Sequence, residues 1–236
     1  MNFSDAMDEL QSSSNPKSKR DYQNHGANDN IFGVSVTDLR RLSIKIGCDH
    51  ALSRELYNSG NFDAMHLSAM IADPSLLTKD DLDEMVSKAY CHVLSDYVVA
   101  ALATEQKAQD AMTLANKWIS SETEMIKSAG WSTYAMLICI HKDSDLSKSE
   151  IHNHLCFIRD NIANASDHIK NSMIKFVVSV GTAYLPLREE AFAIAKQIGR
   201  IKVSLSAASA KIWNPSSDIQ KVIDKGSLGK KRKGFR

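Results

Sequence analysis

Apolar residues recur at a helical period along most of this chain. From Ser35 onward they fall at positions i, i+3, i+4 and i+7, and each such group is typical of the buried face of an amphipathic helix. These groups are Leu82 to Ala89, Ala108 to Ala115, Ile151 to Ile162 and Ala191 to Ile198. An alternating pattern, typical of a strand, is weak and confined to Ile201–Leu205. The pattern therefore predicts an all-α protein.

The helical pattern is interrupted at a few places that predict boundaries. Gln11–Asn30 is rich in Ser and Asn, which predicts a loop-rich arm after one short helix. Pro74 is predicted to stop one helix, and Pro186 lies where another begins. The predicted domains are an N-terminal helix and polar arm (1–34), a helical array (35–224) and a C-terminal tail (225–236).

Predicted helix starts recur every 43 residues, at positions 35, 78, 121 and 164. At each start a capping side chain is followed three residues later by an acid, as in a capping box. Helical repeats of the HEAT and armadillo type have periods of about 40–47 residues. Ser147 with Glu150 forms a further box outside this spacing, and such residues are common at any helix start. The regular spacing nevertheless favours an α–α superhelix, or solenoid, of stacked HEAT-like repeats.

The charge distribution is uneven although the formal net charge of the 236 residues is only +1. The twelve residues 225–236 hold six basic side chains and no acidic one. The remaining 224 residues hold 23 basic and 28 acidic side chains, a net charge of −5. A basic end on an acidic body suggests an anionic partner such as nucleic acid.

Composition excludes several classes of protein. A hydrophobic content of 43% excludes wholesale disorder. The first ten residues are not typical of a secretory signal, and the longest apolar runs are far shorter than the ~18 residues of a membrane span. Four cysteines without a CxxC pattern favour a reducing compartment, so a cytoplasmic location is expected.

Motifs for cofactors, metals and hydrolytic triads are weak or missing. The sequence contains no GxGxxG, Walker A or GxSxG pattern, and no cofactor is expected. His152 and Cys156 are four residues apart and share a helix face if the segment is helical. A zinc site there is disfavoured, because no second ligand pair of standard spacing is present and Leu155 belongs to the apolar stripe.

Several stretches, taken in order, resemble the AlkD-like DNA alkylation repair family, whose members are HEAT-like α-solenoids. The resemblance covers roughly residues 20–236, and its order and spacing carry more weight than any single motif. Its main stretches are His25–Ala27 with Phe32–Arg40, Leu56–Asn61 with Ala69–Pro74, Tyr90–Val98, Lys117–Trp131, and Ile198–Val203 with the basic end.

This resemblance implies DNA binding in a concave groove and hydrolytic removal of alkylated purines. Alkylation of a ring nitrogen makes the purine cationic, so it leaves as a neutral base with little acid assistance. The developing sugar cation requires a fixed carboxylate and an activated water. Relatives that are active use an Asp for this, together with aromatic rings and an Arg that hold the nucleotide.

Transferred residue by residue, the family pattern is matched in part. The catalytic carboxylate is expected at Asp96, although an ungapped comparison puts the family's Asp on Ser95; capping of a helix is the alternative role for Asp96. Aromatic and substrate-binding positions fall on Tyr90, His92, Trp131 and Phe176. The family's Arg falls on Ser128, with Lys127 beside it, and a lysine does not reproduce the bidentate phosphate grip of Arg. Trp118 is expected in the core.

Phosphate contacts are expected from lysines of the helical array and from the tail. The candidates are Lys127, Lys170, Lys175, Lys202, Lys230, Lys231 and Arg232. A solubilising, disordered end is the alternative interpretation of the tail. Two functions follow: a protein that binds double-stranded DNA, damaged or non-specific, and excises alkylated purines, or a non-catalytic HEAT-like scaffold that binds nucleic acid or protein.

Overall fold

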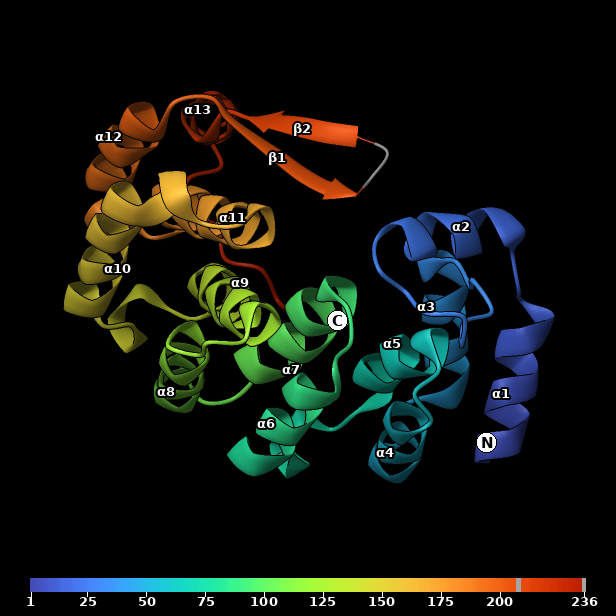
Figure 1. Ribbon diagram of the computed structural model, residues 1–236. Helices are drawn as coiled ribbons and strands as arrows, with labels where there is room; N and C mark the ends of the chain where they lie inside the picture. The colour runs from blue at the N-terminus through green and yellow to red at the C-terminus, as the bar shows by residue number, and fades with distance from the viewer. Residues whose placement is uncertain (207–208, 235–236) are drawn as a thin grey trace. The chain divides into compact units, whose positions relative to one another are not determined.

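The structure is a computed structural model that describes residues 1–206 and 209–234, and its elements are labelled in Figure 1. The chain divides into two compact units, one from Met1 to Leu102 and one from Ala103 onward. This division falls inside the predicted helical array. The boundaries predicted after residues 34 and 224 stay predictions.

The first unit is helical throughout its regular structure. Helices α1, α3, α4 and α5 bury one apolar core, which includes Leu10, Leu39, Leu56 and Leu67. The elements are α1 (Phe3–Ser12), α2 (Pro16–Asn24), α3 (Val36–Ile46), α4 (His50–Asn58), α5 (Phe62–Ile71), the 3₁₀ turn η1 (Pro74–Leu76), α6 (Lys79–Lys88) and the π-helical segment η2 (Leu94–Val99). Helix α7 (Ala100–Thr104) continues directly from η2.

The second unit is built around two long helices, α9 and α11, which pack against each other. Helix α8 packs on α9, and helices α12 and α13 pack on α11. The elements are α8 (Ala108–Ile119), α9 (Glu124–Ile140), η3 (Asp143–Asp145), α10 (Lys148–Asn161), η4 (Ile162–Asn164), α11 (Asp167–Ala183), η5 (Leu185–Leu187), α12 (Arg188–Ile198), β1 (Ile201–Ser206), β2 (Ser209–Trp213) and α13 (Pro215–Asp224).

Two of the four predicted helix starts are confirmed. Ser35 caps α3, and Thr78 forms a reciprocal capping box with Asp81 at the start of α6. The starts predicted at Ser121 and Asn164 are wrong, because α9 and α11 are preceded by Thr123 and Ser166. The spacing of 43 residues also does not mark the same place in each pair of helices. Helix α6 packs on η2, which follows it, whereas α9 packs on α8, which precedes it.

Helix α2 lies in the segment predicted to be a loop-rich arm. No residue of α2 is buried, so the apolar stripe that reveals a helix is missing. The helix is instead started by the Asn15 side chain, which accepts hydrogen bonds from two backbone N–H groups, and by Pro16 in the first turn. Its position requires a glycine: a Cβ on Gly33 would lie 2.6 Å from the backbone nitrogen of Lys19.

The second unit also contains an antiparallel hairpin of β1 and β2. The strand predicted at Ile201–Leu205 is confirmed as β1, whereas β2 was not predicted. In the register of the hairpin Lys202 is opposite Ile212, and Val203 is opposite Lys211. Val203 is buried in the unit, whereas Lys202 is exposed and Ile212 is 58% exposed. One face of the hairpin is therefore open to solvent.

Candidate nucleic-acid interface

In the first unit, three of the predicted site residues lie in or just before η2. The Asp96 side chain is buried, with 2% of the residue exposed, and accepts a hydrogen bond of 3.0 Å from the Ser95 hydroxyl. Nδ1 of His92 lies 3.9 Å from Oδ1 of Asp96, one helical turn away. Asp96 is the third residue of η2, and the N-cap position is occupied by Val93, so Asp96 is not an N-cap.

Tyr90 and Tyr97 flank this buried group. The Tyr90 hydroxyl is buried and makes no hydrogen bond within the part of the chain that the structure describes. Burial is the main cause that raises the pKa of the Tyr90 phenol above its ordinary value. Tyr97 is 48% exposed. Tyr97 is not among the predicted site residues, because the family resemblance assigns no role to this position.

In the second unit, Trp131 and Phe176 lie together in an aromatic cluster. Their ring centroids are 5.6 Å apart in an edge-to-face arrangement, and both side chains are fully buried. His154 packs edge-on against both rings, and Phe157, which is 48% exposed, stacks on Trp131 at 6.0 Å. Trp118 is buried as predicted. The two predicted groove aromatics thus belong to the core of this unit.

An open hollow lies at the edge of this cluster, with Lys127, Trp131 and Phe157 among its lining residues. Its volume, solvent included, is about 830 Å³. The indole Nε1 of Trp131 is buried and has no hydrogen-bond partner among the described residues. The structure therefore places Lys127 and Trp131 in one hollow, with Phe176 behind the indole ring.

The sequence resemblance assigns the position of the family's Arg to Ser128. Ser128 is fully buried, and its Oγ lies 3.4 Å from Oγ of Ser172 on the neighbouring helix α11. A small hydroxyl in the interior offers no positive charge to a phosphate. Lys127 is half-buried, and Lys170 lies 3.9 Å from Asp167 in an i,i+3 ion pair.

The basic tail is packed onto the unit rather than detached from it. Lys231 Nζ lies 2.7 Å from both the Asp143 carboxylate and the Ile138 carbonyl oxygen. The Arg232 N–H donates to the Cys139 carbonyl, which also belongs to the last turn of α9. The structure therefore does not agree with the alternative prediction of a disordered end over residues 225–234. Lys230, Arg232 and Lys233 remain exposed.

The hairpin adds basic side chains that the sequence pattern only partly indicated. Arg200, Lys202 and Lys211 are exposed, and Lys211 Nζ lies 3.3 Å from the centroid of the Trp213 ring. Lys202 had been predicted as a phosphate contact and Lys211 had not. The alternation of polar and apolar residues in β2 is short, and its first residues are polar. The sequence of β2 alone therefore does not predict a strand.

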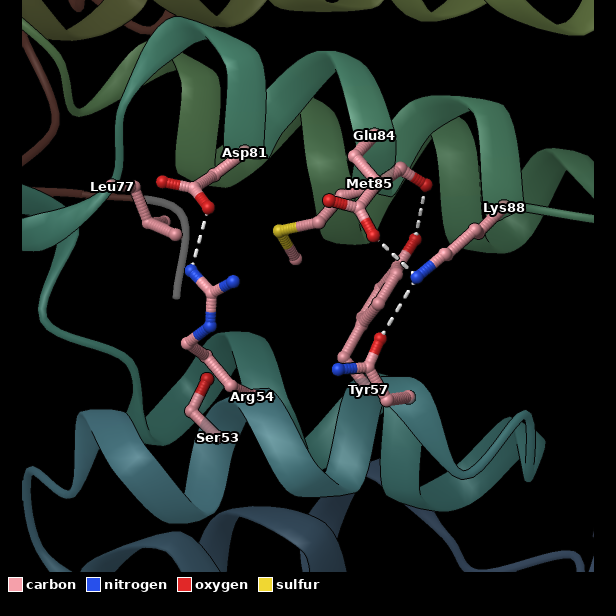
Figure 2. A pocket seen from close by; sticks show the side chains of 9 residues that line it. Ser53, Arg54, Tyr57, Leu77, Asp81, Glu84, Met85 and Lys88 are labelled. Carbon is pink, nitrogen blue, oxygen red and sulfur yellow. Dashed lines mark hydrogen bonds and ion pairs between the residues drawn. The ribbon is translucent and has the colours of Figure 1, made fainter.

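Figure 2 shows another cavity, between α4 and α6 of the first unit, whose polar groups are already paired. Arg54 forms an ion pair of 2.6 Å with Asp81, and Lys88 bonds to Glu84 and Asn58. Hydrogen bonds from Thr78 and Arg54 lower the pKa of Asp81 to about 2. Since these charges pair with one another across the cavity, they serve the contact between the two helices.

Comparison with known proteins identifies the family. Residues 6–208 match the family described as "DNA alkylation repair enzyme". The chain belongs to this family. Uncharacterized proteins of Listeria innocua and Listeria monocytogenes are 28% and 26% identical to it, over 91% of this chain and 94% of each relative.

One solved structure is similar to this chain over almost the whole length of both proteins. It is described as "a new family of proteins related to the HEAT-like repeat DNA glycosylases with affinity for branched DNA structures". The two chains are 37% identical, the TM-score is 0.91, and the match covers 99% of this chain and 98% of the other. The prediction of an all-α, HEAT-like repeat fold in the DNA alkylation repair family is thereby confirmed.

Two further observations concern membranes and metal ions. Within residues 1–206 and 209–234, no helix is long and apolar enough to cross a membrane. Among the same residues, His152, Cys156 and Glu190 form a group whose potential ligand atoms lie within 4.8 Å of one another. The sequence predicted the first two of these as neighbours on a helix and gave no sign of the third.

Proposed function

We propose that this protein binds branched, double-stranded DNA through the phosphate backbone. The observation that carries this proposal is the likeness, at 37% identity over nearly both whole chains, to a protein described as having affinity for branched DNA structures. Membership of the DNA alkylation repair family supports a role on damaged DNA. The expectation of a reducing compartment supports a cytoplasmic location.

The exposed and half-buried cations of the second unit support a phosphate-binding role. We assign contacts to Lys127 beside the hollow, to Lys202 and Lys211 on the hairpin, and to Lys230 and Arg232 of the tail. Lys170 and Lys175 are half-buried and, unlike Lys127, do not line the hollow, so they are secondary candidates. Lys231 is assigned to the fold, because its ammonium group is already held by Asp143 and Ile138. Phosphate contacts carry affinity and salt dependence without base specificity.

The hairpin is suited to a branch point because its open face combines charge and apolar surface. Lys202 and Ile212 are directly opposite each other in the strand register and are both exposed. At a branch, base pairs end and their stacked faces are open to apolar side chains, while phosphates of different arms lie close together. Lys202 is suited to contact the phosphates, and Ile212 is suited to contact the open faces of the base pairs.

Base excision is the competing function, and three observations argue against it. The Asp96 carboxylate is buried, Ser128 at the predicted Arg position is a buried hydroxyl, and Trp131 and Phe176 are fully buried. Excision needs a carboxylate that reaches the sugar of the target nucleotide. We therefore propose a binding protein that has kept the family's fold and not its chemistry.

Two measurements on the full-length protein test this proposal. Fluorescence anisotropy compares a four-way junction with a linear duplex of equal length at several salt concentrations, and tighter, salt-dependent junction binding is expected. In parallel, methylated duplex DNA is incubated with the protein and released bases are quantified; no release is expected. Release that is lost in Asp96→Asn overturns the non-catalytic assignment. Equal or absent binding of both DNAs at low salt overturns the branched-DNA assignment.

A further inference from the structure

Helices α10 and α12 bring together three metal-binding side chains that the DNA-binding proposal does not use. His152 and Cys156 are one turn apart on the same face of α10, and Glu190 lies in the first turn of α12. One potential ligand atom of each lies within 4.8 Å of the others. The adjoining face of α10, with Ile151, Leu155 and Ile158, is buried in the core. His152 and Cys156 are thus displayed by a helix that the core holds in place, and Glu190 reaches them from α12.

The close ion-pair contact between His152 and Glu190 orients the imidazole ring. Nδ1 of His152 lies 2.7 Å from Oε1 of Glu190. Because an ionised carboxylate can only accept a hydrogen bond, Nδ1 carries the proton in the neutral ring. Nε2 then keeps its lone pair, and it is this nitrogen that lies near Cys156, with Nε2 and Sγ 3.7 Å apart. Glu190 therefore selects the tautomer that leaves a ligand atom beside the thiol.

The separation of the nitrogen and the sulfur matches a shared zinc ion. Zinc binds sulfur at about 2.3 Å and nitrogen at about 2.0 Å with tetrahedral angles, which places the two donors roughly 3.5 Å apart. The observed 3.7 Å differs by a small side-chain movement. A carboxylate that accepts the other ring N–H of a ligand histidine is the usual outer partner in zinc sites.

We propose that Cys156 and His152 bind Zn²⁺ through Sγ and Nε2, with Glu190 as the residue that positions the histidine. Thiolate and imidazole together favour zinc over magnesium or calcium. Solvent occupies the other coordination positions, because His152 is exposed and its partners are half-exposed. Arg159, one turn further along α10, is held by Asp160 through two hydrogen bonds of 2.7 and 3.0 Å, which offset its charge.

Cobalt titration of the reduced full-length protein tests the site directly. Co²⁺ bound to a thiolate gives a charge-transfer absorption in the near ultraviolet, and Zn²⁺ displaces it. We expect this band in the wild type and its loss in Cys156→Ser and in His152→Ala. Glu190→Gln keeps both ligands and removes the charged acceptor, so we expect metal affinity about 10–100-fold weaker rather than abolished.

Matched controls separate this site from non-specific binding by thiols or histidines. Cys48→Ser removes an exposed cysteine of the first unit and is expected to leave the band and the affinity unchanged. Circular dichroism of each variant verifies that the helices have folded. Absence of a thiolate band in the wild type, or a band that persists in Cys156→Ser, overturns the proposal. Junction binding is measured in the same samples, so failure of the metal site and failure of the DNA proposal are distinguishable.

Discussion

The hydroxyl of Ser95 donates a 3.0 Å hydrogen bond to the carboxylate of Asp96, and both residues lie inside the π-helical segment η2. A π turn accommodates one more residue than an α turn, so side chains after it are shifted in register relative to those before it. The two candidate positions for the family's Asp, Ser95 and Asp96, both lie within this segment. The two neighbours form one buried pair.

Asp96→Asn tests whether this carboxylate acts on DNA. The substitution keeps the shape and removes the charge from a side chain that is 2% exposed. We expect the dissociation constant for a four-way junction, measured by anisotropy, to change by less than about twofold, which corresponds to less than ~0.4 kcal/mol. A tenfold loss of binding without a change in melting temperature would contradict this and would place Asp96 at the DNA.

Removal of the hairpin charges is expected to weaken DNA binding and its salt dependence. Each lost phosphate contact lowers the slope of log affinity against log salt by about 0.9. We therefore expect Lys202→Ala with Lys211→Ala to reduce the slope by about 2 for a duplex arm. The control variant replaces Lys17 and Lys107, two exposed lysines outside the hairpin. If both double variants lose the same slope, the hairpin has no special role.

Lys231→Ala is expected to destabilise the protein more than Lys230→Ala. The first removes an ion pair with Asp143 and a hydrogen bond to the last turn of α9, whereas the second removes an exposed side chain. Loss of a partly buried charged hydrogen bond costs about 1–3 kcal/mol. Urea unfolding followed by circular dichroism measures the difference. Equal free energies of unfolding for the two variants would mean that the tail contact contributes nothing.

His66 is expected to make the first unit less stable in acid. Burial, with a smaller contribution from Arg40, lowers its pKa from 6.5 to about 4 in the folded chain. Between these pH values the unfolded chain binds a proton that the folded chain does not, so stability falls as the pH falls. The loss reaches about 2–3 kcal/mol by pH 4.

Replacement of His66 isolates this contribution from that of other groups. The free energy of unfolding is measured from pH 7 to pH 4 for the wild type, for His66→Gln and for His25→Gln, which changes an exposed histidine. His66→Gln is expected to flatten the profile, and His25→Gln to leave it as in the wild type. Identical profiles for all three proteins would refute the assignment.

Two glycines on long helices are expected to differ in their tolerance of alanine. A Cβ on Gly130 would lie 2.6 Å from the backbone nitrogen of Ile119, whereas one on Gly181 would meet the Ile219 side chain. A side chain can move and a packed backbone cannot, so Gly130→Ala is expected to cost more, about 3 kcal/mol against about 1. Thermal unfolding of the two variants measures the order, and the reverse order would refute it.

The fold was predictable because helix burial leaves a periodic pattern, whereas the sites depend on packing between distant segments. The stripes such as Leu82 to Ala89 mark real helices, and α2 escaped prediction since it buries no residue. No spacing rule indicates that Glu190 reaches His152 from another helix, or that Lys231 is bound by Asp143. The sequence resemblance predicts Asp96 and Trp131 as site residues, and only the structure shows that both are buried.

The contact of Lys231 with α9 has a consequence for synthesis of the chain. The last turn of α9 is completed by residues 93 positions later in the sequence, through the bond from Lys231 to the Ile138 carbonyl. On the ribosome, α9 is synthesised long before residues 229–232 leave the exit tunnel, and until then the carbonyl groups of Ile138 and Cys139 lack these two partners. The second unit therefore reaches its final stability only when this segment emerges, which leaves a late interval in which it is open to chaperones and proteases.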